Sequence, residues 1–187
     1  MKKLPVKDRL VATASKLFYE QGYNRTGINE ILKESGVAKA SMYQHFRSKD
    51  EIAIAHLKFM DVNFRSALTQ RAENLPKGSE RMMAIFQFVH DFYQKPEYRG
   101  CWNLNMISEI PKEDQVILKE IQSQKRRIKR WIEEEVQGNL HAKDSTTVAN
   151  QLYLLFEAAM MESQLFQDEW PIVTAKDLAL KLIQANE

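Results

Sequence analysis

The sequence predicts an all-α protein of about nine helices, and three observations support this fold class. Apolar residues recur at helical spacing through most of the chain. No segment shows the alternation of apolar and polar residues that is typical of a half-buried strand. Only 6 Gly and 5 Pro occur in 187 residues, so long helices have few interruptions.

The amino-terminal part of the chain predicts three short helices. Pro5 fits the first turn of the first helix, where its missing N–H needs no partner, and Gly22 ends that helix. Thr26 is expected to cap the second helix, which Gly36 ends. The third helix is expected over 39–46. The apolar residues that define the buried faces of the first two helices are Leu10, Ala14, Leu17, Phe18, Ile28, Ile31 and Leu32.

Six further helices are expected in the rest of the chain. Ser48 and Glu51 have the spacing of a capping box at the start of the fourth helix. Ser79 and Asp144 are candidate caps of the fifth and eighth helices, and Pro111 is expected to open the seventh. The six helices are predicted over 49–71, 80–94, 102–110, 111–137, 145–166 and from beyond Pro171 to about 184.

Charge divides the chain into a basic head and a mildly acidic body. Residues 1–50 carry 10 Lys or Arg against 5 Asp or Glu, giving +5, whereas 51–187 carry 17 against 20, giving −3. A basic head on such a body is typical of a protein whose head meets a polyanion. We therefore predict two domains, 1–48 and 49–187.

Several classes of function find no support in the sequence. The single cysteine, Cys101, excludes an intramolecular disulfide and a multi-thiolate zinc site, and is typical of a reducing cytoplasm. The apolar runs are too short to span a membrane, and the amino terminus leads into charged sequence without a secretory signal. No Gly-rich phosphate loop, nucleophile and base pairing or metal-ligand spacing occurs, so neither an enzyme nor a cofactor or metal is expected.

The segment 26–46 has the proportions of a helix-turn-helix, with a break at Gly36. Its second helix carries side chains suited to a DNA groove, because Gln can read adenine, Lys can donate to guanine, and a small Ala allows close approach or contacts a thymine methyl. An ordinary αα-corner is the alternative, and the basic residues around the corner favour DNA. The outward residues are expected to be Lys39, Ala40, Ser41, Gln44 and His45.

Residues 8–55 resemble the amino-terminal signature of the TetR family of transcriptional repressors. The resemblance is carried by Gly22-Tyr23, Thr26, Ile28, Ile31, Gly36-Val37 and the run 38–52. It implies an all-helical homodimer with a three-helix DNA-binding head and a helical body that binds a small inducer and dimerises through the last two long helices. The positions that fall where the family contacts DNA are Thr26, Lys39, Ser41, Tyr43, Gln44, His45 and Lys49.

The resemblance also implies individual roles in the head. Tyr43, His45 and Lys49 look like phosphate contacts, and Gln44 is the best candidate for reading a base. Ala38 departs from the family pattern, which usually has a Ser or Thr cap there, and the poorer cap costs about 1 kcal/mol. The third helix is therefore expected to fray more in the free protein.

In the body, the segment 152–161 is apolar nearly all round and must be covered on every side. A second subunit would cover it in a homodimer, and the alternative is the central helix of a monomeric bundle. Aromatic and methionine side chains with isolated polar groups predict a pocket for a largely apolar inducer, although core packing would explain the same pattern. The candidate pocket residues are Met83, Phe86, Gln87, His90, Trp102, Asn105, Met106, Tyr153 and Glu157.

Cys101 follows Arg99-Gly100, and a neighbouring cation can make a thiol reactive. It is either a redox sensor or an inert buried thiol. The whole sequence predicts a cytoplasmic, ligand-responsive repressor that an inducer releases from a pseudo-palindromic operator. The alternatives are a helical scaffold or binding module that has lost DNA binding, and a helical enzyme.

Overall fold

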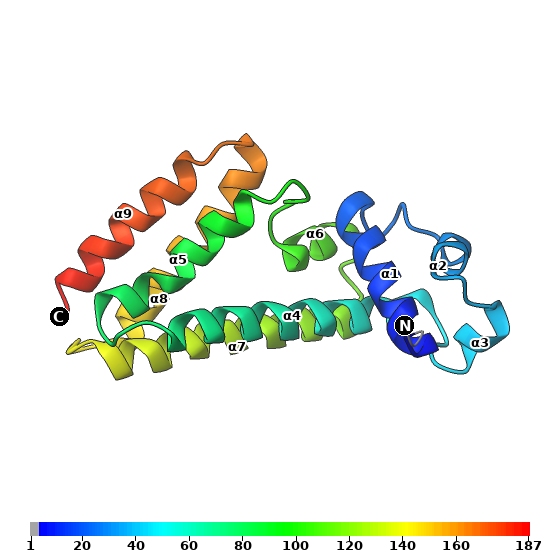
Figure 1. Ribbon diagram of the computed structural model, residues 1–187, viewed down its shortest axis with the longest axis horizontal. Coiled ribbons are helices and arrows are strands. Elements are labelled where there is room, and N and C mark those ends of the chain that lie inside the picture. The colour runs from blue at the N-terminus through cyan, green and yellow to red at the C-terminus, as the bar shows by residue number, and fades with distance from the viewer. Residues whose placement is uncertain (1–3) are drawn as a thin grey trace. The chain divides into compact units, whose positions relative to one another are not determined.

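The computed structural model describes residues 4–187, so Lys2 and Lys3 of the basic head lie outside the described residues. Within 4–187 the chain forms nine helices and no strand, which confirms the predicted all-α fold (Figure 1). No helix in this range is long and apolar enough to cross a bilayer. The helices are α1 Val6–Gln21, α2 Ile28–Ser35, α3 Lys39–Tyr43, α4 Lys49–Glu73, α5 Ser79–Tyr93, α6 Trp102–Glu109, α7 Gln115–Asn139, α8 Ser145–Phe166 and α9 Trp170–Gln184.

The helices group into two compact units. Unit 1 consists of the chain up to Asn63 together with Trp102–Ser123, and unit 2 consists of Phe64–Cys101 together with Gln124–Glu187. Helices α4 and α7 each contribute to both units. Unit 1 therefore contains α6 and the start of α7 in addition to the three amino-terminal helices.

The core of unit 1 is built from the apolar faces of its short helices. Leu10 of α1, Ile31 of α2 and Met42 of α3 are completely buried, as the helical periodicity of the sequence requires. His56 of α4 is also buried in this unit, with its ring edge-on to Phe18 at 5.5 Å between centroids. The first four helices of the chain thus all contribute buried side chains to unit 1.

In unit 2, helices α5, α8 and α9 pack against one another (Figure 1). Phe86 of α5, Leu152 and Met160 of α8, and Ile172 and Ile183 of α9 lie in the core between them. The apolar run of α8 is therefore covered on one side by α5 and α9 of the same chain.

Side-chain caps fix some helix starts as the sequence predicts. The Thr147 N–H donates to the Asp144 carboxylate at 3.0 Å, which confirms the cap of α8. At the start of α4 the Glu51 N–H donates to Ser48 Oγ at 3.2 Å, and the Glu51 carboxylate accepts from the Arg47 N–H at 2.7 Å. These two hydrogen bonds form a capping box in which the second partner is residue 47.

Other predicted helix ends are wrong. The N-cap of α2 is Gly27 and not Thr26, and the N-cap of α5 is Gly78 and not Ser79. Pro111 lies in a turn before α7, where the Asp114 carboxylate accepts from the Ile117 N–H at 3.0 Å and caps the helix. Gly27 and Gly78 have the extended or otherwise non-helical backbone that an N-cap requires.

The third helix is also shorter than predicted. It ends at Tyr43, and the Phe46 N–H reaches back to the Met42 carbonyl at 2.9 Å in a turn. Gly138, which the sequence places at the end of α7, lies inside that helix. The predicted ends of α1 and α2 at Gly22 and Gly36 are confirmed.

Candidate nucleic-acid interface

The turn between α2 and α3 has the geometry of a helix-turn-helix. Gly36 adopts the left-handed conformation, with φ 60° and ψ 37°, and the Val37 N–H donates to the Leu32 carbonyl at 3.1 Å. The Arg9 guanidinium of α1 donates to the Ser35 carbonyl at 3.0 Å and to the Gly36 carbonyl at 2.7 Å. Helix α1 therefore holds this turn. No local pattern indicates this role of Arg9, because its partners lie 26 and 27 residues away.

Helix α3 and the turn after it present opposite faces to the core and to solvent. Met42 and Phe46 are buried, at 0% and 4% exposure, whereas Tyr43 is 49% exposed. Ser41 is half-buried. The predicted contact residues that are exposed on the outer side are Lys39, Ala40, Tyr43, Gln44 and His45. Arg25 and Arg47 are exposed as well, so cations flank this surface.

Thr26 lies inside the head and not on its surface. Its side chain is fully buried, and its hydroxyl donates to the Gly22 carbonyl at 2.8 Å and accepts from Gln21 Nε2 at 3.2 Å. The hydroxyl thus stabilises the turn that leads into α2. Any phosphate contact near Thr26 would have to use the backbone N–H groups at the start of α2.

Lys49 lies at the first position of α4, half-buried against the head. Its Nζ atom is 4.1 Å from the centroid of the Tyr23 ring, a cation–π distance, and the Tyr23 hydroxyl donates to the Asp50 carboxylate. Burial lowers the pKa of Lys49, while the charges of Asp50 and Glu109 oppose that shift. Burial and the hydrogen bond to Asp50 raise the pKa of Tyr23, which stays protonated. Lys49 is thus a cation held in place.

Helix α3 starts without a side-chain cap. Ala38 is its N-cap, with an extended backbone at φ −66° and ψ 144°, and makes no side-chain hydrogen bond. This agrees with the departure from the family pattern at this position. The backbone geometry of a capped helix is therefore present without the capping oxygen.

Helix α6 of the same unit supplies a residue that the sequence did not single out. The Asn24 N–H donates to Glu109 Oε2 at 2.6 Å, and the Asn24 side-chain amide donates to the Glu109 carbonyl at 2.8 Å. The two residues are 85 positions apart, so no local pattern could have linked them.

The nine predicted pocket residues are divided between the two units. Six lie in unit 2, and Trp102, Asn105 and Met106 lie in unit 1 on α6. Phe86 is fully buried in the core of unit 2. Met83 and Gln87 line a pocket of about 500 Å³, together with Arg71, Asn74, Leu75, Glu80 and Ala84.

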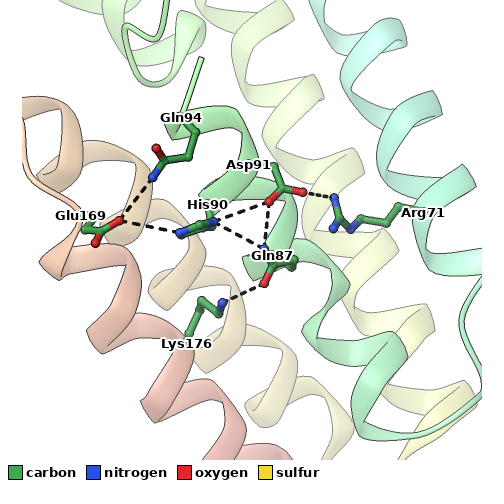
Figure 2. A network of polar contacts seen from close by, with 7 residues as sticks. All are labelled: Arg71, Gln87, His90, Asp91, Gln94, Glu169 and Lys176. Carbon is green, nitrogen blue, oxygen red and sulfur yellow. Dashed lines mark hydrogen bonds and ion pairs between the residues drawn. The ribbon is translucent and has the colours of Figure 1, made fainter. Parts of the chain in front are cut away.

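Gln87 and His90 belong to a polar network between α4, α5 and α9 (Figure 2). Lys176 of α9 donates to Gln87 Oε1 at 2.8 Å, and Gln87 Nε2 donates to Asp91 at 2.9 Å. His90 lies between two carboxylates, 3.6 Å from Asp91 and 3.7 Å from Glu169. Both predicted pocket residues therefore also link neighbouring helices.

A second polar cluster surrounds Cys101 in unit 2. Cys101 is buried, and the Lys125 ammonium donates to its Sγ at 3.2 Å and to the Glu157 carboxylate at 2.8 Å. Burial lowers the pKa of Lys125, but Cys101 and Glu157 outweigh it and raise the pKa above its usual value. Burial, followed by the charge of Glu157, raises the pKa of Tyr153 to about 12. Tyr153 and Glu157 thus share one charged environment.

Comparison with known proteins identifies the family. Residues 10–55 match the family model described as bacterial regulatory proteins, tetR family, and residues 78–178 match the tetracyclin repressor-like C-terminal domain. The chain belongs to the TetR family. This confirms the resemblance in its amino-terminal part and extends it over most of the body.

Three curated relatives of this TetR family chain are named as transcriptional regulators. The YxaF regulator of Bacillus subtilis is 49% identical over 84 residues, 44% of this chain and 42% of that protein. The activator FasR of Mycolicibacterium smegmatis is 33% identical over 86 residues, 46% and 39%. The repressor NemR of Escherichia coli K12 is 28% identical over 107 residues, 56% and 53%. The matches thus span about half the length of these relatives or less.

Solved structures confirm the fold over nearly the whole chain. SCO4454, a TetR-family regulator from Streptomyces coelicolor, aligns with a TM-score of 0.88 at 24% identity and covers 97% of this chain and 89% of its own. The reduced form of E. coli NemR aligns with a TM-score of 0.84 at 19% identity and covers 93% and 94%. At these identities the likeness concerns the fold.

Proposed function

We propose that this protein is a DNA-binding transcriptional regulator, a cytoplasmic homodimeric repressor that a small, largely apolar inducer releases from a pseudo-palindromic operator. The observation that carries the proposal is the exposed outer side of α3, where groove-sized polar side chains are flanked by cations. It is supported by membership of a family whose curated relatives are named as regulators. No enzymatic role is proposed.

The residues of the head divide into two roles. Tyr43, His45 and Lys49 contact phosphates, which makes binding salt-dependent, and the start of α2 beside Thr26 adds backbone donors. Gln44 is the main base-reading residue, with Lys39 and Ser41 beside it and Ala40 against a thymine methyl. Each mismatched base pair then costs about 1–3 kcal/mol.

Dimerisation through α8 and α9 is supported by the apolar side chains that the single chain leaves exposed. Leu154, Met161 and Leu165 are 65%, 47% and 69% exposed and recur along one face of α8. Trp170, Val173 and Leu180 are exposed on α9. An apolar surface of this kind is typical of a subunit interface.

Regulation follows from the geometry of a dimer on DNA. Two recognition helices must enter major grooves roughly 34–36 Å apart, or at another matching spacing, so an inducer need only stabilise dimers with a different separation. Helix α4 connects head and body and is the lever in this proposal. The inducer site is proposed between α5 and α8 of unit 2, with the six candidate pocket residues of that unit as its lining. A coupling of about 1–3 kcal/mol would lower operator affinity roughly 5- to 150-fold.

The test is to select DNA from a random pool with the purified protein and to measure binding of two variants by fluorescence anisotropy across salt concentrations. Gln44→Ala should relax sequence choice. Lys49→Ala should weaken specific and random DNA alike and reduce the salt slope by about 1. Lys16→Ala, on the exposed side of α1, is the matched control. Equal losses for both variants on all DNA would contradict the assigned roles. If the protein selects no DNA from the pool, the result favours a scaffold that has lost DNA binding.

A role of Cys101 as a redox sensor is favoured by one contact, the Lys125 ammonium 3.2 Å from its Sγ. A neighbouring cation is a feature of reactive cysteines. We expect hydrogen peroxide to lower the operator affinity of the wild-type protein and to leave that of Cys101→Ser unchanged. Equal responses of the two proteins would make Cys101 an inert buried thiol.

A further inference from the structure

The turn between α1 and α2 is held by the last residue of α6. The Asn24 N–H donates to the Glu109 carboxylate at 2.6 Å, and the Asn24 side chain donates to the Glu109 backbone carbonyl at 2.8 Å. Glu109 accepts one hydrogen bond with its side chain and one with its backbone carbonyl. The first is the stronger, because its acceptor is a charged carboxylate. The second also satisfies a carbonyl at the end of a helix, which lacks a partner within it.

The chain leaves room for this carboxylate at Gly22. Gly22 has φ +96°, and a Cβ atom built on it would lie 2.5 Å from Glu109 Oε1 and 3.0 Å from Oε2. No side chain larger than hydrogen fits beside the carboxylate as it stands. The backbone conformation therefore favours glycine here, and a Cβ atom would displace the Glu109 carboxylate.

The same carboxylate faces the start of α4. Its charge acts on Lys49, whose ammonium lies over the Tyr23 ring. The turn that Glu109 holds leads directly into α2 and carries the exposed Arg25. Glu109 is thus connected to the segment before α2 and to the candidate phosphate contact at α4.

We propose that Glu109 is a positioning residue for DNA binding. By holding Asn24 it fixes α2 and α3 relative to Lys49, so that base and phosphate contacts form together. The inference rests on the proposed DNA-binding function. Glu109 itself would not touch DNA, since its carboxylate is already bonded to the turn.

The sign of a substitution effect separates positioning from charge. By charge alone, removing a carboxylate near a surface that binds DNA strengthens binding, because repulsion of the phosphates is lost. If Glu109 positions the head, its removal weakens binding. Glu113→Ala provides the matched control, because it removes an exposed carboxylate in the segment after α6 of the same unit.

The experiment measures the anisotropy of a labelled duplex that the wild-type protein has selected from a random pool, over a range of salt. We expect Glu109→Ala to bind about tenfold more weakly with an unchanged salt slope, since the contacts to phosphate remain. Glu113→Ala should bind as tightly as the wild type or more tightly. Glu109→Gln, which retains a side-chain acceptor, should lie between the wild type and Glu109→Ala.

The outcomes separate this inference from the function on which it rests. A wild-type protein that binds DNA, with Glu109→Ala equal to or tighter than Glu113→Ala, overturns the positioning role alone. A wild-type protein that selects no DNA overturns the function and the inference together. If thermal melts show that Glu109→Ala does not fold, Glu109→Gln replaces it, because it changes the acceptor of the Asn24 N–H and keeps the size of the side chain. Binding by Glu109→Gln as tight as that of Glu113→Ala then overturns the inference.

Discussion

The two compact units place their polar and charged side chains in different ways. In unit 1 the candidate DNA contacts Lys39, Gln44 and His45 are exposed on short elements. In unit 2 Lys125 and Glu157 form an ion pair whose side chains are only 19% and 18% exposed. The two residues lie on different helices, 32 positions apart in the sequence. A surface group can be exchanged with little effect on stability, whereas a half-buried ion pair cannot lose one partner without cost. The difference predicts where substitutions affect stability and where they affect binding.

The largest effect is expected for Lys125→Met in unit 2. The substitution leaves the Glu157 carboxylate half-buried without its cation, beside Tyr153, and should lower the free energy of unfolding by about 3 kcal/mol. Urea unfolding at fixed protein concentration measures the loss. Arg71→Met is the matched control, because it breaks a pair whose side chains are 35% and 47% exposed and should cost less than about 1 kcal/mol.

The double variant Lys125→Met/Glu157→Leu sharpens the same comparison. Removing both charges leaves neither one uncompensated, so we expect most of the stability to return. Equal losses for Lys125→Met and Arg71→Met would show that the two ion pairs differ in burial without differing in energy.

Local patterns predicted the helices well and the ion pairs of the body poorly. The caps at Asp144 and Ser48 are hydrogen bonds between residues three positions apart. Both partners therefore appear in one short stretch of sequence, from which the cap can be predicted. The Arg81 guanidinium donates to the Glu135 carboxylate at 2.6 Å and 2.9 Å, across 54 positions. Lys125 and Glu135, at the two ends of the charged run 125–135, both pair with side chains of other helices, and the spacing within the run indicates neither partner.

The second expected effect concerns His56 in the core of unit 1. Burial lowers its pKa to about 4, and its Nδ1 finds no hydrogen-bond partner within 4–187. An unfolded chain takes up the proton near pH 6.5, so stability is present above that pH and is lost as pH falls toward 4. From pH 7.5 to 4.5 the contribution of His56 should fall by about 2–3 kcal/mol.

His56→Leu tests this expectation, because leucine fills a similar volume without titrating. Its unfolding free energy should depend less steeply on pH between 7.5 and 4.5 than that of the wild-type protein. The measurement is urea unfolding at several pH values. Parallel pH profiles of the two proteins would contradict a neutral, buried imidazole.

A smaller effect is expected for Arg9→Ala, which removes the guanidinium from the carbonyls of Ser35 and Gly36. Hydrogen bonds from a charged donor are lost on a partly exposed surface, so we expect a cost of about 1.5 kcal/mol in thermal or urea unfolding. Operator affinity should fall as well, because the turn before α3 loses its support. Lys16→Ala on the same helix is the control, with a side chain 71% exposed. An equal effect of both substitutions would leave Arg9 as a surface cation only.

The candidate DNA contacts illustrate what a motif can and cannot predict. Gln44 and His45 are exposed, as the helical spacing predicts, although they lie in the turn after α3. The burial of Thr26 and the hydrogen bonds between Asn24 and Glu109 depend on how the helices of unit 1 pack. A short stretch of sequence does not predict this packing. Motif matching therefore finds the surface that meets the ligand and misses the contacts that hold this surface in place.

The smallest expected effect is a gain, from Ala38→Ser at the start of α3. The backbone of Ala38 already has the extended conformation of an N-cap, so a serine hydroxyl could accept from the N–H of residue 40 or 41 without rearrangement. We expect the unfolding free energy to rise by about 1 kcal/mol. Operator affinity should rise by a few fold at most, because less order is lost when the recognition helix binds.

Ala40→Ser is the control for the stability measurement on Ala38→Ser, since it adds the same hydroxyl at the second residue of α3, where serine does not cap. Thermal stability should therefore improve for Ala38→Ser and not for Ala40→Ser. If neither variant differs from the wild-type protein in stability, then α3 is ordered by the packing of Met42 and Phe46, and the missing cap costs nothing. The order of α3 would then depend on contacts between residues far apart in the sequence, as the ion pairs of the body do.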